Sequence, residues 1–141
     1  MPVSGEFLLP VRVYYEDTDA GGVVYHSKYL NYFERGRTEM LRTLGFEQDC
    51  LMQEDDVIFA VRSVEVEYHK PARFNNELQV TTRVEVVKKA SMTFRQALSL
   101  TGQDTMLCEL KGRVACLTAS TLKPRAIPGE ILNALEASSA G

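Results

Sequence analysis

The second half of the chain alternates apolar and polar side chains with a period of two residues. From Leu78 onward the even positions are apolar or Thr, and the odd positions between them are polar. Such alternation is typical of strands with one face in water, and the short links between the runs favour an antiparallel meander. The pattern predicts strands over residues 57–68, 78–87, 92–100 and 106–116, with a shorter first strand over 11–15.

One segment has the period of a helix instead. Between Ser27 and Leu44, five residues recur at spacings of three and four: Tyr29, Phe33, Gly36, Met40 and Leu44. This spacing predicts an amphipathic helix that ends before Gly45. Since a mid-helix glycine costs about 1 kcal/mol relative to Ala, we expect another element to pack closely against Gly36. Glu34 and Arg37 have the spacing of an intrahelical ion pair.

The order of these elements predicts an α+β fold in which one five-stranded antiparallel sheet covers one long helix. Shorter helices are expected around residues 48–53 and 129–137. We expect a single domain over residues 1–137 and a flexible tail over 138–141. A lone sheet on a lone helix leaves its strand edges open, and oligomerisation is a common way to cover them.

Composition narrows the class of protein. The chain has 141 residues with 16 Lys and Arg against 19 Asp and Glu, a formal charge of −3. That balance argues against nucleic acid as a partner. No run approaches the roughly 20 apolar residues that span a bilayer, and the first ten residues lack the pattern of a secretory signal. Three cysteines without C-x-x-C spacing indicate free thiols and a cytoplasmic protein.

The segment before the predicted helix concentrates the reactive side chains. Glu16, Asp17 and Asp19 are followed by Gly21 and Gly22, and then by His26 at the helix start. A calcium loop counted from Asp17 would have Lys28 at its twelfth position, where Glu is required, so that interpretation fails. A phosphatase-type Asp-x-Asp nucleophile would need a larger scaffold. An acidic loop that favours the helix dipole remains open beside a catalytic carboxylate.

No zinc site can be assembled from the two histidines and three cysteines at recognised spacings, and no flavin or nicotinamide motif is found. We therefore expect neither a metal nor a cofactor.

The residues of this segment follow a distinctive order. It reads Tyr15-x-Asp17-Thr18-Asp19-x-x-Gly22-Val23-Val24-Tyr25-His26 and continues as Tyr29-Leu30-x-Tyr32-Phe33-Glu34-x-x-Arg37. This stretch resembles the signature of the 4-hydroxybenzoyl-CoA thioesterase family, and most of all the acyl-CoA thioesterases associated with the Tol-Pal system. The likeness continues through residues 66–73 and 123–128, so it covers nearly the whole chain.

The resemblance implies a hotdog fold, in which a curved antiparallel sheet wraps around one long central helix. It also implies a homodimer or homotetramer with the active site at the dimer interface. Asp19 is then the catalytic carboxylate, as nucleophile or as general base. The backbone N–H at His26 would face the thioester oxygen, where a helix start offers free N–H groups. The His26 side chain has either a direct role or a structural one.

The substrate implied by the resemblance is an acyl-CoA, with acyl carrier protein as a second carrier. Candidate substrate-binding residues are Gly22, Tyr25, Tyr29, Arg62, Arg73 and Lys88, of which the last three are cations for the phosphates of CoA. Two other functions stay open. A hotdog hydratase or dehydratase would show an Asn-Pro between closely spaced Asp and His residues, which is absent here. The other is a non-catalytic protein that binds acyl-CoA or acyl carrier protein, and only measured turnover of a thioester would exclude it.

Overall fold

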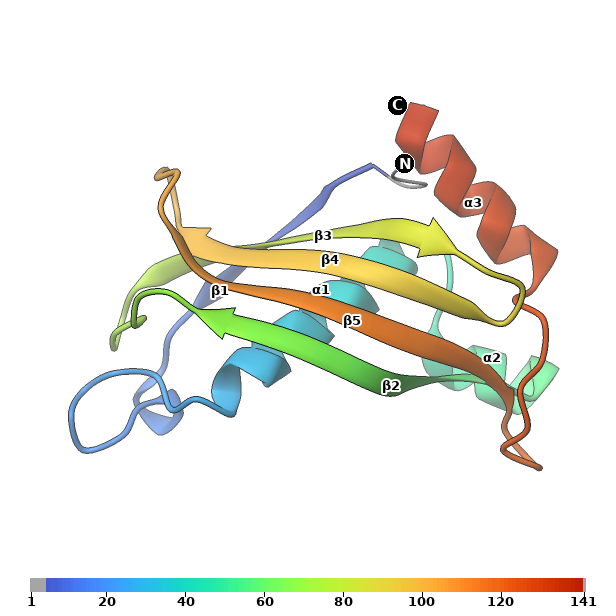
Figure 1. Ribbon diagram of the computed structural model, residues 1–141, viewed down its shortest axis with the longest axis horizontal. Helices are drawn as coiled ribbons and strands as arrows, with labels where there is room; N and C mark the ends of the chain where they lie inside the picture. Colours follow the sequence, from blue (N-terminus) through green and yellow to red (C-terminus); the bar gives the residue numbers. More distant parts are fainter. Residues whose placement is uncertain (1–4, 141) are drawn as a thin grey trace.

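The computed structural model describes the backbone of residues 5–140 and the side chains of residues 5–138. Five strands form one antiparallel sheet in the order β1-β3-β4-β5-β2 (Figure 1): β1 (Phe7–Arg12), β2 (Val57–Tyr68), β3 (Glu77–Val87), β4 (Ser91–Leu100) and β5 (Met106–Thr118). Three helices accompany it: α1 (Lys28–Thr43), α2 (Gln48–Asp55) and α3 (Gly129–Ala140). The fold is therefore α+β, as predicted. None of the helices in the described part of the chain has the length and apolar character needed to cross a membrane.

The four later strands lie where the alternation predicts them, but the prediction for the first strand is wrong. β1 covers Phe7–Arg12, and the chain then forms a short 3₁₀ turn over Tyr15–Asp17. Pro10 makes this segment look unlike a strand, since proline lacks a backbone N–H. It is accommodated here because β1 is an edge strand, where proline is tolerated.

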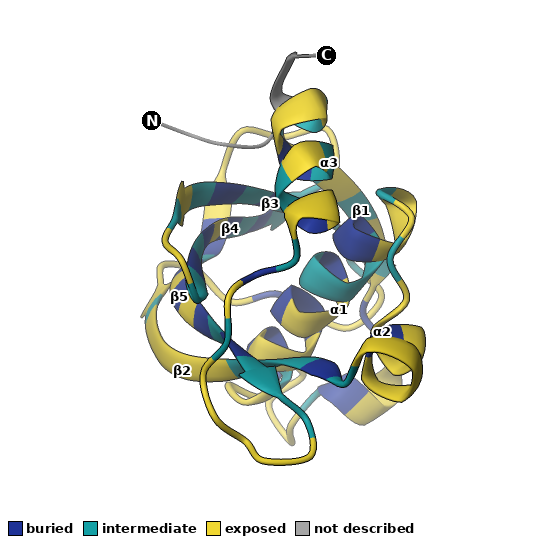
Figure 2. Ribbon diagram, turned by 90° about the vertical axis from the view of Figure 1, so that its right-hand side faces the viewer, coloured by how far each residue is buried: buried dark blue, intermediate teal, exposed yellow. Residues whose placement is uncertain are grey.

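The longest helix, α1, lies against the inner side of the curved sheet (Figure 2). It packs on β3 and β1, and it buries Tyr29, Tyr32, Phe33, Met40 and Leu41. The close approach expected at Gly36 is confirmed. A Cβ atom there would lie 2.7 Å from Thr82 Oγ1 and 2.9 Å from Val80 Cγ1, both on β3. Only glycine lets the helix sit this close to the sheet.

The other two helices complete the core. Leu51 of α2 and Ile131 and Leu135 of α3 join a cluster around Met40, so α1 is not the only helix that covers the sheet. α3 continues to Ala140, whereas the sequence predicted a helix ending at 137 and a tail after it. Within that segment the Ser138 hydroxyl donates to the carbonyl of Leu135 at 2.7 Å. Gly141 lies outside the described residues.

Candidate active site

The segment with the paired acidic residues folds into a tight hairpin. Thr18 and Val24 pair as an antiparallel bridge, and the N–H of Asp19 donates to the carbonyl of Val23 at 2.9 Å. Gly22 closes the turn with a φ of +79°, a left-handed conformation that glycine adopts without steric cost. The hairpin therefore presents Asp19, which is exposed, near its tip.

A second segment holds this hairpin in place. The N–H of Val24 donates to the carbonyl of Ala72 at 2.8 Å, and Val23 forms a bridge with Arg73. Arg73 thus lies beside the hairpin although it is about fifty residues away along the chain. Of the three predicted cations, it is the one that the fold brings to the Asp19 loop.

The other two predicted cations lie elsewhere in the chain. Lys88 follows the far end of the 11-residue strand β3, roughly 35 Å from its start at about 3.3 Å per residue. Arg62 lies midway along the edge strand β2. A single chain therefore does not gather Arg62 and Lys88 around Asp19.

Asp17 and Asp19 have opposite environments. Asp17 is buried, and its Oδ2 accepts hydrogen bonds from the Tyr32 hydroxyl at 2.8 Å and from the Tyr14 N–H at 3.0 Å. Burial, together with this carboxylate, raises the pKa of Tyr32. Asp17 therefore ties the base of the hairpin to α1.

Only one of the two oxygens of the Asp19 carboxylate accepts a hydrogen bond from the described residues. Its Oδ1 accepts the N–H of Gly21 at 2.8 Å, which fixes the orientation of the group. Its Oδ2 has no donor among the described residues. An oriented carboxylate with one free, exposed oxygen is suited to attack a carbonyl carbon or to accept a proton from water.

The start of α1 offers backbone donors close to this hairpin. The N-cap position, Ser27, makes no side-chain capping bond. The backbone N–H of His26 has no acceptor in the described part of the chain, while its carbonyl accepts the Tyr68 hydroxyl at 3.1 Å. The His26 ring is exposed and packs against Tyr25, with ring centroids 4.4 Å apart. A helix start of this kind attracts negative charge.

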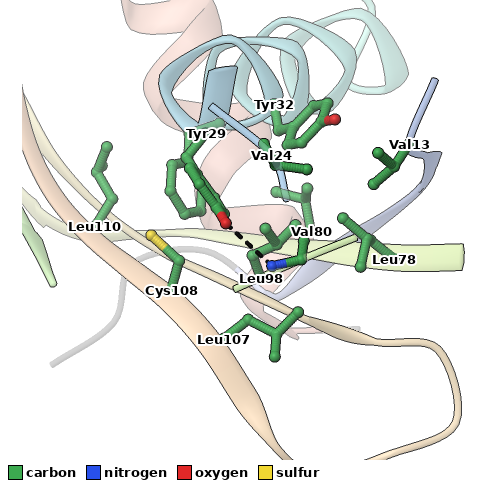
Figure 3. Close-up of a cluster of buried hydrophobic side chains, with 12 residues drawn as sticks. Val13, Val24, Tyr29, Tyr32, Leu78, Val80, Leu98, Leu107, Cys108 and Leu110 are labelled. Carbon is green, nitrogen blue, oxygen red and sulfur yellow. Dashed lines mark hydrogen bonds between the residues drawn. The ribbon is translucent and has the colours of Figure 1, made fainter. Parts of the chain in front are cut away.

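Tyr29 lies inside the core rather than on the surface. Its oxygen accepts the N–H of Ala72 at 3.1 Å, the hydrogen bond drawn in Figure 3. Burial raises the pKa of Tyr29, and the negative charge of Asp19 adds to the effect. Tyr29 therefore ties the helix start to the segment that anchors the hairpin, and it forms only one wall of the site.

A shallow, open pocket of about 310 Å³ lies between the start of α1 and the end of β2. It is lined by Val24, His26, Tyr29, Tyr68, Lys70 and Pro71, among others. Tyr68 is among these lining residues, although the sequence does not predict it as a site residue. The available signal was an aromatic residue at the end of a strand, three residues before Pro71, within the stretch that resembles the family.

Comparison with known proteins identifies the family. The sequence model of the thioesterase-like superfamily matches residues 13–135. The chain is 46% identical over 125 residues to the acyl-CoA thioesterase YbgC of Haemophilus influenzae, covering 89% of this chain and 90% of that protein.

Solved structures show the same fold. The Probable Thioesterase from Bartonella henselae superposes with a TM-score of 0.83 at 35% identity, covering 88% of this chain and 100% of that one. The 1,4-dihydroxy-2-naphthoyl-CoA thioesterase Slr0204 from Synechocystis shares the fold with a TM-score of 0.86 at 18% identity, covering 93% of this chain and 96% of that one. The resemblance predicted from the residues is confirmed, and the chain belongs to the thioesterase-like superfamily, with its hotdog fold.

Proposed function

We propose that this protein hydrolyses acyl-CoA thioesters and releases a carboxylic acid and free CoA. The observation that carries the proposal is the carboxylate of Asp19, of which one oxygen accepts no hydrogen bond from the described residues. The hairpin holds it beside the start of α1, which has no side-chain cap. The relatives named acyl-CoA thioesterase, at 46% identity over most of the chain, support the same activity.

In the proposed reaction the thioester carbonyl oxygen accepts the backbone N–H of His26. One such donor is typically worth about 3 kcal/mol at the transition state. Asp19 then acts in one of two ways. Either it attacks the carbonyl carbon and forms an acyl-aspartate anhydride, which water hydrolyses, or it takes a proton from water, whose oxygen attacks instead. In the first route the C–S bond breaks as the anhydride forms, and CoA leaves as a thiolate that takes a proton from solvent. In the second route the proton that Asp19 takes from water passes to the sulfur as the C–S bond breaks.

The remaining candidate residues contact different parts of the substrate in this proposal. Gly22 and Tyr25 flank the proposed reaction centre, because both belong to the hairpin and its exit toward α1. Arg73 provides positive charge for the phosphates of CoA next to the hairpin. An acyl carrier protein would present the same thioester, and the proposal includes it as a second carrier.

We further propose that two chains complete the site. β2 is a 12-residue edge strand, and edge strands present unpaired backbone groups that favour pairing with another strand. β1, the opposite edge, carries Pro10, which blocks such pairing. A homodimer joined through β2, or a tetramer of two such dimers, brings Arg62 or Lys88 of one chain toward the hairpin of the other.

In this proposal residues 1–137 act as one hotdog domain, and α1 is its central helix. The three free thiols, two of them buried, support a reducing compartment, the cytoplasm.

The decisive experiment measures hydrolysis of a panel of acyl-CoAs with a reagent that detects the released thiol. Turnover of at least one acyl-CoA, abolished by Asp19→Asn, is the expected result. Tight acyl-CoA binding without turnover would favour the non-catalytic binding partner. Hydration of an enoyl-CoA without thiol release would favour the hydratase. Either of these results would overturn the thioesterase proposal.

A further inference from the structure

Tyr68, the last residue of β2, makes a hydrogen bond that connects the sheet to the proposed reaction centre. Its hydroxyl donates to the backbone carbonyl of His26 at 3.1 Å, although the two residues are 42 positions apart. This carbonyl has no other donor among the described residues. The reaction proposed above uses the N–H of His26 and assigns no part to Tyr68.

Two peptide groups meet at His26, and each is fixed by a different hydrogen bond. The first group contains the carbonyl of Tyr25 and the N–H of His26, which is the proposed donor to the thioester oxygen. Its carbonyl accepts the N–H of Lys28 at 2.9 Å, in the turn that leads into α1. The second group contains the carbonyl of His26 and the N–H of Ser27, and its carbonyl accepts the Tyr68 hydroxyl. The helix start therefore fixes one peptide group, and Tyr68 fixes the other.

Tyr68 is itself held in a defined position. Its ring packs edge-to-face on the ring of Tyr29, with centroids 5.3 Å apart and an interplanar angle of 78°. Directly after it, the N–H of His69 donates to the carbonyl of Leu107 at 2.8 Å and ties the end of β2 to β5. The hydroxyl is thus presented from a rigid strand end, which positions a group more precisely than a loop does.

A carbonyl that is free to rotate beside the reaction centre would oppose the reaction. Negative charge develops on the thioester oxygen in the transition state, and donors aimed at that oxygen stabilise it. Rotation of the second peptide group would turn the negative end of its dipole, the carbonyl of His26, toward that charge. A hydrogen bond to the carbonyl prevents this rotation, and it also strengthens the N–H of the same peptide group as a donor. That N–H belongs to Ser27 and has no acceptor within the described part of the chain.

We propose that Tyr68 is a positioning residue for thioester hydrolysis, whose hydroxyl holds the start of α1 in the orientation that binds the negatively charged oxygen. The inference rests on the thioesterase function proposed above. A tyrosine hydroxyl has one O–H donor, and the carbonyl of His26 accepts that of Tyr68, so it is not available to the thioester oxygen. Tyr68 therefore acts through the backbone, and loss of its hydroxyl should weaken binding of the transition state more than binding of the substrate.

The first test is Tyr68→Phe, which removes the hydroxyl and keeps the ring that packs on Tyr29. Steady-state kinetics uses the acyl-CoA that the unmodified protein hydrolyses fastest. We expect kcat to fall about tenfold, which corresponds to about 1.4 kcal/mol, while KM stays within about twofold. An unchanged kcat would overturn the inference.

Tyr15→Phe is the matched control, since it removes the same hydroxyl group from the base of the Asp19 hairpin. Tyr15 is 80% exposed, and its hydroxyl has no hydrogen-bond partner among the described residues. This variant should keep the kcat of the unmodified protein. A loss as large as that of Tyr68→Phe would mean that the effect does not depend on the bond to His26, and it would contradict the proposed role of Tyr68.

Two unreactive analogues of the substrate separate positioning from general structural support. An alkyl thioether of CoA has no carbonyl and measures binding of the rest of the substrate. A trifluoromethyl ketone, joined to the sulfur of CoA through a methylene group, becomes tetrahedral by addition of water or of Asp19 and carries the oxygen that the start of α1 binds. In Tyr68→Phe the dissociation constant of the ketone should rise about tenfold, and that of the thioether should not change. Equal losses for both analogues would rule out positioning.

The two proposals fail in different ways. The absence of hydrolysis of every acyl-CoA by the unmodified protein overturns the thioesterase function, and this inference with it. Hydrolysis by the unmodified protein with an equal kcat in Tyr68→Phe overturns only the role of Tyr68. A Tyr68→Phe protein that does not fold, as measured by circular dichroism, would give the hydroxyl a structural role and would also overturn the inference.

Discussion

At the residue scale, two aspartates only two positions apart have different environments, since Asp17 is buried and Asp19 is exposed. We expect Asp19→Asn to lower kcat by about a thousandfold or more, since Asn neither attacks a carbonyl nor takes a proton from water. Substrate affinity should stay within a few-fold. Steady-state kinetics, together with circular dichroism, measures both quantities.

Asp17→Asn is the matched control for that prediction. The substitution replaces the Asp17 carboxylate, which accepts hydrogen bonds from the Tyr32 hydroxyl and the Tyr14 N–H, with an amide. We expect it to lower the free energy of unfolding by about 1–2 kcal/mol while kcat per folded molecule stays within tenfold. An inactive Asp17→Asn beside an active Asp19→Asn would mean that the wrong carboxylate has been assigned.

The cysteines give a second prediction at this scale. Burial raises the pKa of Cys108 to about 12 and also raises the pKa of Cys116, so both remain protonated near pH 8. Cys50 is exposed. A thiol reagent should therefore modify one cysteine per folded chain and three after unfolding. Cys50→Ser should abolish the reaction of the folded protein, and a second reactive thiol there would contradict the burial of Cys108 and Cys116.

The raised pKa of Cys108 makes the free energy of unfolding depend on pH. Because the folded pKa of Cys108 lies above its ordinary value of 9.0, the folded state favours the protonated thiol. The stabilisation is complete below about pH 9 and is lost as the pH rises toward 12. Urea unfolding between pH 8 and 11 should show this decrease, and Cys108→Ala should reduce it.

At the scale of elements, the packing of α1 on β3 depends on one missing side chain. Gly36→Ala improves helix propensity by about 1 kcal/mol, but its Cβ would meet Thr82 and Val80 at less than 3 Å. We expect the clash to prevail and the free energy of unfolding to fall by about 1–3 kcal/mol. Asn31→Ala, at an exposed position of the same helix, should change it by less than about 0.5 kcal/mol. A Gly36→Ala protein more stable than the unmodified one would contradict the close packing.

At the scale of the whole molecule, the two edges of the sheet are predicted to behave differently. Light scattering should give two or four times the chain mass of 15.8 kDa. Val64→Lys places a charge on β2 and should shift the mass toward the monomer, with loss of activity. Leu8→Lys makes the same kind of change on β1, where Leu8 is 50% exposed, and should leave the assembly intact. A fully active monomer would rule out a site shared between chains.

The sequence by itself determined most of the elements and the family. Alternation over residues 78–116 predicted three strands, and the spacing from Tyr29 to Leu44 predicted α1. These predictions hold because the side chains of one strand or helix share a face whose polarity can be read locally. The order of residues from Tyr15 to Arg37 resembles the 4-hydroxybenzoyl-CoA thioesterase family without any use of tertiary contacts, and the match to the thioesterase-like superfamily confirms that resemblance. The sequence does not predict the start of β1, because a strand tolerates Pro10 only at the edge of a sheet, and strand order is a tertiary property.

The tertiary structure decided what depends on residues far apart in the chain. The Tyr32 hydroxyl binds the buried Asp17 carboxylate and so anchors the hairpin to α1. The segment around Ala72 holds the Asp19 hairpin near the start of this helix. The strand order leaves β2 at an edge away from α1, so apolar residues that alternation would bury are exposed. Arg37 has the spacing of a partner for Glu34, yet Gln96 of β4 holds it instead. Helical spacing states which residues share a face, but only the packing of that face decides which neighbours they contact.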